Sequence, residues 1–167
     1  HELHGERAGV ARVDDVLTGG LRGPEGRGHL FQTLLDLGTP LVDFHDGTFH
    51  LGGDLWRWSG RTRTAPSGHP DLSELLAYAR RFLWAPYQWG GRSVFGIDCS
   101  GLVQASLLAC GIDCPGDSDL QQAIGKPIAE KAALKRGDLL FWKGHVAMCM
   151  NADFMIHATA AFMSTMA

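Results

Sequence analysis

The sequence lacks both a long apolar run and an excess of positive charge. A membrane-spanning helix needs about 18 or more consecutive apolar residues, and no such run occurs in this chain of 167 residues. The formal net charge is −3, so the chain shows no sign of the basic surface that binds nucleic acid. We therefore expect neither a membrane span nor a nucleic-acid partner.

Cysteine is scarce, with four in the chain: Cys99, Cys110, Cys114 and Cys149. An even number permits disulfides in a secreted protein, but Cys110 and Cys149 lie in apolar runs, where a reduced cysteine behaves as a small hydrophobic residue. Cys110 and Cys114 have the spacing of half a metal site, but no second pair follows. We expect free thiols, no metal and no cofactor. Free thiols and the lack of a visible export signal favour the cytoplasm, with a periplasmic or secreted location as the alternative.

Glycine and other turn residues are concentrated in residues 1–64, between short apolar runs. This pattern predicts short strands and a small all-β domain. Trp56 and Trp58 alternate on one predicted strand, and we favour the core of this domain over a substrate-cleft wall as their location. Residues 65–70 contain two prolines and a glycine and are expected to be a linker. Residues 71–167 then form a second domain.

In residues 71–167, helical patterns precede strand patterns, which predicts an α+β fold with helices packed on an antiparallel sheet. The first expected helix runs from Asp71 to the residue before Pro86, with Glu74 in a capping box, and the second runs from Cys99 to Ala109. A third, short helix begins after Ser118, with Gln121 in a second capping box, and ends at Gly125. Strands are expected at 139–142, 146–148 and 154–156.

Cys99 stands at the start of the second predicted helix. The positive end of the helix dipole favours a thiolate there, and the backbone N–H groups of the first turn can hold a developing oxyanion. These properties suit a nucleophile. The alternative is a buried structural cysteine next to a capping residue, Asp98.

His145 and His157 lie on two successive predicted strands. If residues 151–153 form a three-residue loop, Met150 pairs with Phe154, and the two histidines share one face at a diagonal distance of about 7 to 8 Å. A two-residue loop would place them on opposite faces. In the first arrangement His157 can fix the tautomer of His145, as the aspartate does in a serine triad.

Five motifs occur in the order found in the NlpC/P60 family, and residues 70–160 resemble that family. The motifs are Pro86-Tyr87-Gln88-Trp89-Gly90-Gly91, Asp98-Cys99-Ser100-Gly101-Leu102-Val103, Gly137-Asp138-Leu139, His145-Val146 and His157-Ala158. The resemblance implies a papain-like cysteine peptidase with Cys99 as nucleophile, His145 as base and His157 as the orienting residue. Most members cut the bond from γ-D-glutamate to diaminopimelate or lysine in peptidoglycan stem peptides, so it also implies a peptidoglycan-derived substrate.

The resemblance assigns further residues around the nucleophile. The hydroxyl of Tyr87 is expected near the oxyanion, and Asp98, Ser100, Ser118 and Trp89 are expected to contact substrate. In members with an SH3-like domain before the peptidase domain, the acid at the position of Asp98 binds the free amine of L-Ala. Residues 21–42 loosely resemble a bacterial SH3-like repeat, so residues 1–64 are expected to form an SH3-like barrel.

Two positions depart from the family pattern. The family often has an arginine, facing the acidic substrate, where this chain has Gly116, and Arg92 or an arginine of the first domain is a candidate to supply that charge. Little chain is left after Ala158 for the strand that usually follows.

Three other functions stay open from the sequence. The chain could be a wall-binding protein without catalytic activity, a papain-like acyltransferase, or a zinc protein with Cys99, His145 and His157 as ligands. The oligomeric state is not indicated by the sequence.

Overall fold

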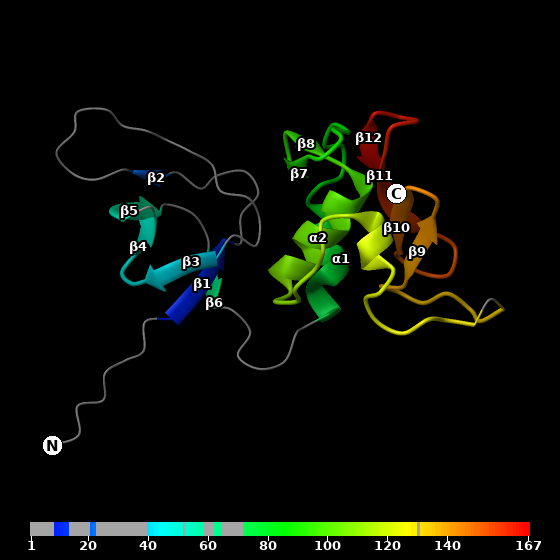
Figure 1. Cartoon of the computed structure of the whole chain (residues 1–167), viewed down its shortest axis with the longest axis horizontal. Helices are drawn as coiled ribbons and strands as arrows, with labels where there is room; N and C mark the ends of the chain where they lie inside the picture. Colours follow the sequence, from blue (N-terminus) through cyan, green and yellow to red (C-terminus); the bar gives the residue numbers. More distant parts are fainter. Residues whose placement is uncertain are drawn as a thin grey trace, which may run out of the picture. The chain divides into compact units, whose positions relative to one another are not determined.

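The structure, a computed structural model, describes residues 9–13, 21–22, 40–51, 53–58, 62–64, 72–129 and 131–167. The chain divides into two compact units, His1–Ser67 and Gly68–Ala167 (Figure 1). The linker expected at 65–70 lies outside the described residues, as does the predicted helix cap Asp71. Within the described part of the chain, no helix is both long and apolar enough to cross a membrane.

The first unit contains short antiparallel strands. One sheet has the order β3-β1-β6 and the other has the order β2-β5-β4. The strands are β1 (Gly9–Val13), β2 (Leu21–Arg22), β3 (Pro40–Phe44), β4 (Thr48–Leu51), β5 (Asp54–Trp58) and β6 (Thr62–Thr64). Asp46 and Gly47 form the turn between β3 and β4, and both have positive φ angles, of 47° and 77°, as a tight hairpin turn requires.

Apolar side chains from three of these strands form the core of the first unit. Leu41, Phe49 and Trp58 are buried together, and Phe44 and Trp56 pack against them while partly exposed. Trp56 and Trp58 therefore contribute to the core of this unit, as favoured from their alternation on one strand.

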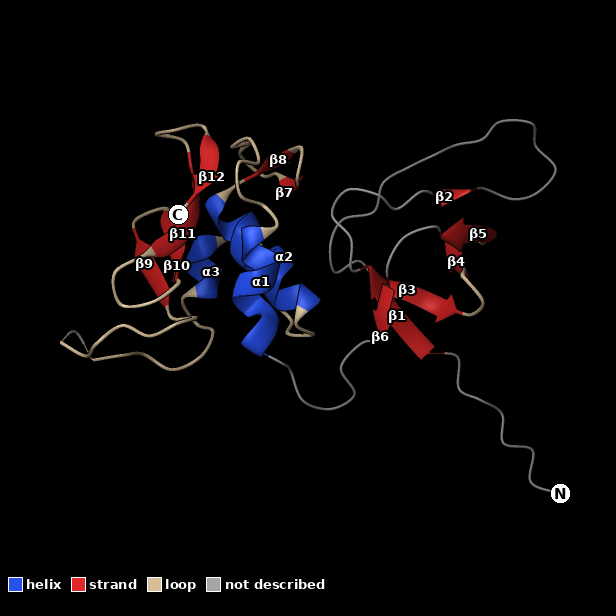
Figure 2. Cartoon of the chain, turned by 180° about the vertical axis from the view of Figure 1, so that it is seen from behind, coloured by secondary structure: helices blue, strands red, loops and turns tan. Residues whose placement is uncertain are grey.

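The second unit is a layer of helices beside a four-stranded antiparallel sheet, which confirms the predicted α+β plan. The sheet order is β12-β11-β10-β9, and α1 and α2 lie on one side of it in both cartoon views (Figure 2). The elements are the 3-10 turn η1 (Leu72–Glu74), α1 (Leu75–Arg80), β7 (Arg92–Ser93), β8 (Gly96–Ile97), α2 (Cys99–Ala109), α3 (Ser118–Gln121), β9 (Leu139–Trp142), β10 (His145–Cys149), β11 (Met155–Thr159) and β12 (Ser164–Met166).

Helix α2 is the central element of the second unit and has the predicted bounds. Leu102, Val103 and Leu107 are buried, and the helix packs against α1, β10 and β11. It ends at Ala109, and Gly111, two residues later, has a φ of 79°. The N–H groups of Gly111 and Ile112 donate to the carbonyls of Leu108 and Leu107, which is the glycine-terminated ending expected here. Burial against both the sheet and α1 fixes the position of its first residue, Cys99.

The first helix is shorter than predicted. Residues 72–74 form a 3-10 turn, the α-helix ends at Arg80, and Glu74 occupies the N-cap position without a side-chain cap bond. The capping box predicted for Asp71 and Glu74 stays a prediction, because Asp71 lies outside the described residues. Trp84 has a φ of 70°, and its N–H donates to the carbonyl of Thr165 at 2.9 Å. Pairing with the C-terminal segment takes the chain out of the helix before Pro86.

A fourth strand, β12, completes the sheet, which corrects the expectation that little chain was left for it. It pairs antiparallel with β11, with His157 opposite Met166 and Thr159 opposite Ser164. A tight connection at 160–163 makes this pairing possible, and Met163 adopts a φ of 51° there. Eight residues after Thr159 are enough because a hairpin needs little connecting chain.

Candidate active site

Cys99 is the first residue of α2, as predicted, and its side chain is almost enclosed, with 7% of the residue exposed. The first-turn amides of a helix have no partner within the helix, so this end of α2 presents N–H groups and the positive end of the dipole beside the sulfur. The side chain therefore sits where a thiolate and a developing oxyanion are both stabilised.

Asp98 caps α2 with its side chain. Its Oδ1 atom accepts from the N–H of Gly101 at 2.6 Å and from the hydroxyl of Ser100 at 3.0 Å. Its Oδ2 atom accepts from the N–H of Gly90 at 2.7 Å. The carboxylate thus orders the first turn of the helix and ties it to the Gly90-Gly91 turn. The helix-cap role considered from the sequence is the one that these contacts describe.

His145 and His157 face each other across the β10–β11 hairpin. The N–H of Met150 donates to the carbonyl of Phe154 at 2.8 Å, which closes the predicted three-residue loop. Met148 pairs with Ile156 and Cys149 with Met155, so the two histidines share a face, as the longer loop predicted. Nε2 of His145 lies 2.8 Å from Nδ1 of His157, with the rings nearly perpendicular at 72°.

Both imidazoles are held in their neutral form near pH 7. Burial lowers the pKa of His145 below its ordinary value of 6.5. Burial, and then the neighbouring His145, lower the pKa of His157 in the same direction. Two neutral rings joined by one hydrogen bond need one donor and one acceptor nitrogen. If Nε2 of His145 donates to His157, Nδ1 of His145 is left as a free base.

Tyr87 is fixed by backbone hydrogen bonds on both sides. Its N–H donates to the carbonyl of Met163, next to β12, and the neighbouring Gln88 N–H donates to the carbonyl of Ile97 in β8. Burial raises the pKa of the Tyr87 hydroxyl, and the charges of Cys99 and Asp98 raise it further. The phenol therefore keeps its proton at neutral pH. It is close enough to the Cys99 and Asp98 side chains to interact with them electrostatically.

The other residues predicted to contact substrate differ in how exposed they are. Ser100 is buried and bonded to Asp98. Ser118 is partly exposed at the start of α3. Trp89 is 85% exposed, next to the Gly90 amide that binds Asp98. The structure thus brings Tyr87, Asp98, Ser100 and Trp89 to the end of α2 that carries Cys99.

Gln121 has a role that its capping-box pattern did not indicate. Its side chain is fully buried, and its Nε2 atom donates to the carbonyls of Ser100 and Pro115, each at 2.9 Å. The N-cap of α3 is Asp117, without a side-chain cap bond, so the capping box predicted for Ser118 and Gln121 was wrong. Gln121 instead fastens the loop before α3 to the first turn of α2, a tertiary contact that local spacing cannot reveal.

Arg92 forms a second connection between these segments. Its Nη1 atom donates to Oδ1 of Asp98 at 2.8 Å and to the carbonyl of Gly91 at 3.0 Å, and its Nη2 atom donates to the carbonyl of Gly116 at 2.9 Å. The positive charge is thereby paired with Asp98 in a partly buried ion pair. Arg92 therefore braces the site, where the sequence had suggested a substrate-facing charge in place of the residue missing at Gly116.

The four cysteines are free thiols. Within the described ranges, no group of three or more His, Cys, Asp or Glu side chains is arranged to hold a metal ion. The geometry therefore offers no support for the zinc alternative with Cys99, His145 and His157 as ligands.

A cysteine at a helix N-terminus, beside a sheet that carries a coupled histidine pair, defines the papain-like class of sites. Comparison with known proteins narrows this class. Residues 84–165 match the NlpC/P60 family. The NlpC/p60 domain of the peptidoglycan hydrolase SagA is 34% identical, with a TM-score of 0.51 over 56% of this chain and 85% of that one. The chain belongs to the NlpC/P60 family.

This chain is also similar to parts of longer proteins. The chain is 38% identical over 100 residues to a gamma-D-glutamyl-L-lysine dipeptidyl-peptidase of Bacillus cereus, which covers 55% of this chain and 30% of that protein. It is 36% identical over 93 residues to dipeptidyl-peptidase 6 of Lysinibacillus sphaericus, covering 54% of this chain and 34% of that protein. The matched segment is thus about a third of these relatives.

One solved structure extends the likeness to nearly the whole chain. An NlpC/P60 family protein from Bacillus cereus superposes with a TM-score of 0.76 at 25% sequence identity. The superposition covers 95% of this chain and 57% of that one.

Proposed function

We propose that this protein is a cysteine peptidase that hydrolyses peptides of bacterial peptidoglycan. The observation that carries the proposal is the 2.8 Å contact between Nε2 of His145 and Nδ1 of His157 on the strands that pack against the helix headed by Cys99. The contact occupies one nitrogen of His145, so the other nitrogen is left to accept a proton. The names of the relatives, which include peptidoglycan hydrolases and dipeptidyl-peptidases, support the same substrate class.

The reaction begins with proton transfer from the Cys99 thiol to Nδ1 of His145. The thiolate attacks the carbonyl carbon, and the negative charge on the carbonyl oxygen is stabilised by first-turn amides of α2 and by the Tyr87 hydroxyl. The C–N bond then breaks as His145 returns its proton to the leaving amine, and a thioester remains. Water, deprotonated by His145, attacks the thioester, releasing a carboxylic acid and regenerating the thiol.

The finer proposal is that the bond cut joins γ-D-glutamate to a diamino acid in a freed peptide with an N-terminal L-Ala. The relative named as a gamma-D-glutamyl-L-lysine dipeptidyl-peptidase supports this bond. Within this proposal, Asp98 binds the amine through Oδ2, which accepts from Gly90, while Ser100, Ser118 and Trp89 line the peptide. We also propose that residues 1–64 form an SH3-like domain and that the enzyme works in the cytoplasm, which the free thiols support.

The test is turnover of the tripeptide L-Ala-γ-D-Glu-meso-diaminopimelate and of its L-Lys analogue by reduced protein, with products identified by mass spectrometry. We expect release of L-Ala-D-Glu, and loss of turnover by about a thousandfold or more in Cys99→Ala and His145→Ala. A His157→Gln variant should keep part of the activity, since glutamine can still accept from Nε2. Intact peptidoglycan and an N-acetylated tripeptide, used in parallel, test the preference for free peptides.

Binding of the tripeptide without turnover by fresh, reduced protein would contradict the peptidase proposal and favour a wall-binding role. Transfer of the acyl group to an added amine, in excess of hydrolysis, would favour the acyltransferase alternative.

A further inference from the structure

Trp142 is the residue on the other side of His145. It ends β9, and it lies directly opposite His145 in the β9–β10 ladder, across a two-residue turn in which Gly144 has a φ of 72°. Directly paired residues of adjacent antiparallel strands point to the same face. Trp142, His145 and His157 therefore form one row on the face that carries the histidine pair.

The two neighbours hold the imidazole of His145 from opposite sides. The ring centroids of Trp142 and His145 are 5.8 Å apart, with a tilt of 36°, and those of His145 and His157 are 5.1 Å apart. An aromatic pair at such a distance contributes packing and restricts the ring that it touches. The hydrogen bond to His157 fixes one nitrogen of His145, but the ring can still rotate about that bond. The indole blocks this rotation.

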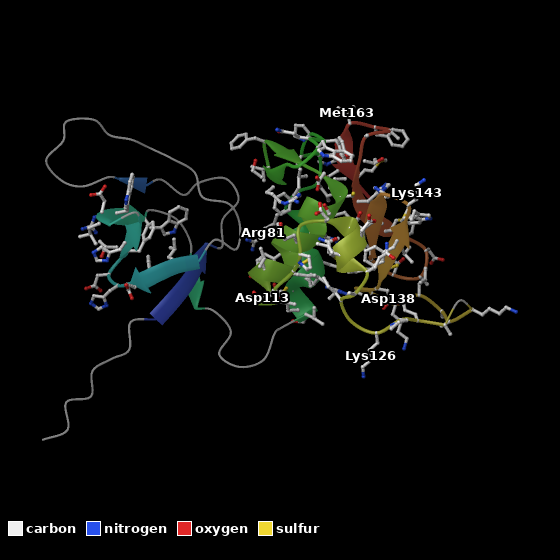
Figure 3. All side chains as sticks on the ribbon, viewed as in Figure 1. Arg81, Asp113, Lys126, Asp138, Lys143 and Met163 are labelled. Atoms are coloured by element: carbon white, nitrogen blue, oxygen red, sulfur yellow. The ribbon has the colours of Figure 1, made fainter. Side chains whose placement is uncertain are left out.

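Trp142 also limits the access of water to His145. It is 48% exposed, so one part of the indole covers neighbouring groups and the other part is open to solvent. Strand β9 is at the edge of the sheet, where no further strand shields the imidazole. In Figure 3, Asp138 and Lys143 mark the two ends of β9, and Lys143 lies in the turn that follows Trp142.

Few ionisable groups lie on the elements around His145. Strand β11 places His157 against His145, helix α2, which begins at Cys99, packs on β10, and β9 carries the uncharged sequence Leu139-Leu140-Phe141-Trp142. Lys143 and Asp138 flank β9, and Lys143 is exposed. Burial lowers the pKa of His145, and the Trp142 indole is one of the apolar groups in contact with its ring.

We propose that Trp142 is a positioning residue for His145: it holds the imidazole against His157 and keeps water from it, so that its free nitrogen stays aimed at the nucleophile. The catalytic role of Trp142 rests on the proposed function. The orientation and the pKa of the His145 ring do not depend on it. Both can be measured in a protein without activity.

The first experiment therefore follows the imidazole directly. In a Cys99→Ala background, NMR titration of labelled histidines gives the pKa of His145 with Trp142 intact, in Trp142→Phe and in Trp142→Ala. We expect the alanine variant to raise the pKa of His145 toward 6.5, because water reaches the ring, and the phenylalanine variant to remain close to the parent. Phe154→Ala, which removes a 62% exposed ring from the residue just before β11, is the matched control and should leave this pKa unchanged.

The second experiment measures turnover of the tripeptide by the same variants with Cys99 present. Trp142→Ala should lower kcat by about tenfold or more with a smaller change in KM, and Trp142→Phe should restore most of the loss. The proposal would be overturned if Trp142→Ala and Trp142→Phe had the same His145 pKa as each other and the same kcat as each other. If the parent protein fails to cleave peptide, the peptidase proposal fails, and the titration still decides the role of Trp142.

Discussion

Arg92 donates to Asp98 at 2.8 Å, and this ion pair joins strand β7 to the first turn of the helix that carries Cys99. The same guanidinium also binds the carbonyl of Gly116. Strand β7, the first turn of α2 and the loop at Gly116, which lies 24 residues after Arg92, therefore meet at one side chain. A planar group with several fixed donors is suited to such a junction, and a lysine ammonium cannot reproduce its geometry.

Replacing Arg92 should destabilise the second unit and disturb the nucleophile together. We expect Arg92→Gln to lower the unfolding free energy by about 1–3 kcal/mol, because a charged hydrogen bond to Asp98 and a bond to Gly116 are lost. Arg92→Lys should recover only part of the loss. Urea unfolding monitored by circular dichroism is the measurement, and Arg80→Gln, an exposed change on α1, is the control. An Arg92→Lys variant as stable as the parent would contradict this role of Arg92.

Gln121 offers a test with a neighbouring control. Gln121→Ala removes a buried amide that donates to Ser100 and Pro115 and leaves a cavity, so we expect a loss of about 2–4 kcal/mol in unfolding free energy. Gln122→Ala changes the same residue type one position later, where the side chain is exposed, and should cost less than about 0.5 kcal/mol. Similar values for the two variants would show that the Gln121 contacts contribute little to stability.

The residues that could be predicted are those whose role is set by nearby sequence. The helix from Cys99 to Ala109 has its apolar side and its terminating glycine within one segment, and the β10–β11 register follows from the loop length. Arg92 and Gln121 could not be assigned, because their partners lie in other segments. The early end of α1 depends likewise on Thr165, which is remote in sequence. Tertiary contacts override local preference at such positions.

Stability should fall on mild acidification because of the histidine pair. The pKa values of His145 and His157 are lowered in the folded state, so the unfolded chain binds more protons once the pH falls through about 6.5. The unfolding free energy therefore decreases with falling pH from that point until the folded-state pKa values are passed. Thermal unfolding of Cys99→Ala between about pH 8 and pH 5 measures this.

The size of the pH effect should depend on the pair itself. His157→Gln removes one of the two titrating rings and should flatten the decrease, whereas His50→Gln, an exposed change in the first unit, should follow the parent. A His157→Gln variant with the same pH dependence as the parent would show that the pair is not its source.

Thiol labelling should distinguish Cys99 from Cys114. Burial raises the pKa of Cys114 to about 11, although the hydrogen bond from Gln121 and the charge of Arg92 act in the other direction. At pH 7 only about one molecule in ten thousand then carries a Cys114 thiolate. We expect iodoacetamide to modify Cys99 first and Cys114 far more slowly, as measured by peptide mass mapping. In Cys99→Ser the slow rate at Cys114 should be unchanged, and labelling of Cys114 at the rate of a free thiol would refute its protection.

Two glycines beside Arg92 should differ in their tolerance of a methyl group. A Cβ atom at Gly101 would overlap the carbonyl oxygen of Gly91 and press on Nη1 of Arg92, whereas a Cβ at Gly116 would lie 3.3 Å from Nη2 of the same side chain. Backbone cannot withdraw as a guanidinium can, so Gly101→Ala should cost about 1–3 kcal/mol or more in unfolding free energy. Gly116→Ala should cost less than about 1 kcal/mol, and because Gly101 follows Cys99 by one helical half-turn, only its variant should also abolish turnover. Comparable urea midpoints for the two variants would mean that the Gly90-Gly91 turn can move away from α2, and that the close packing seen there does not fix the position of Cys99.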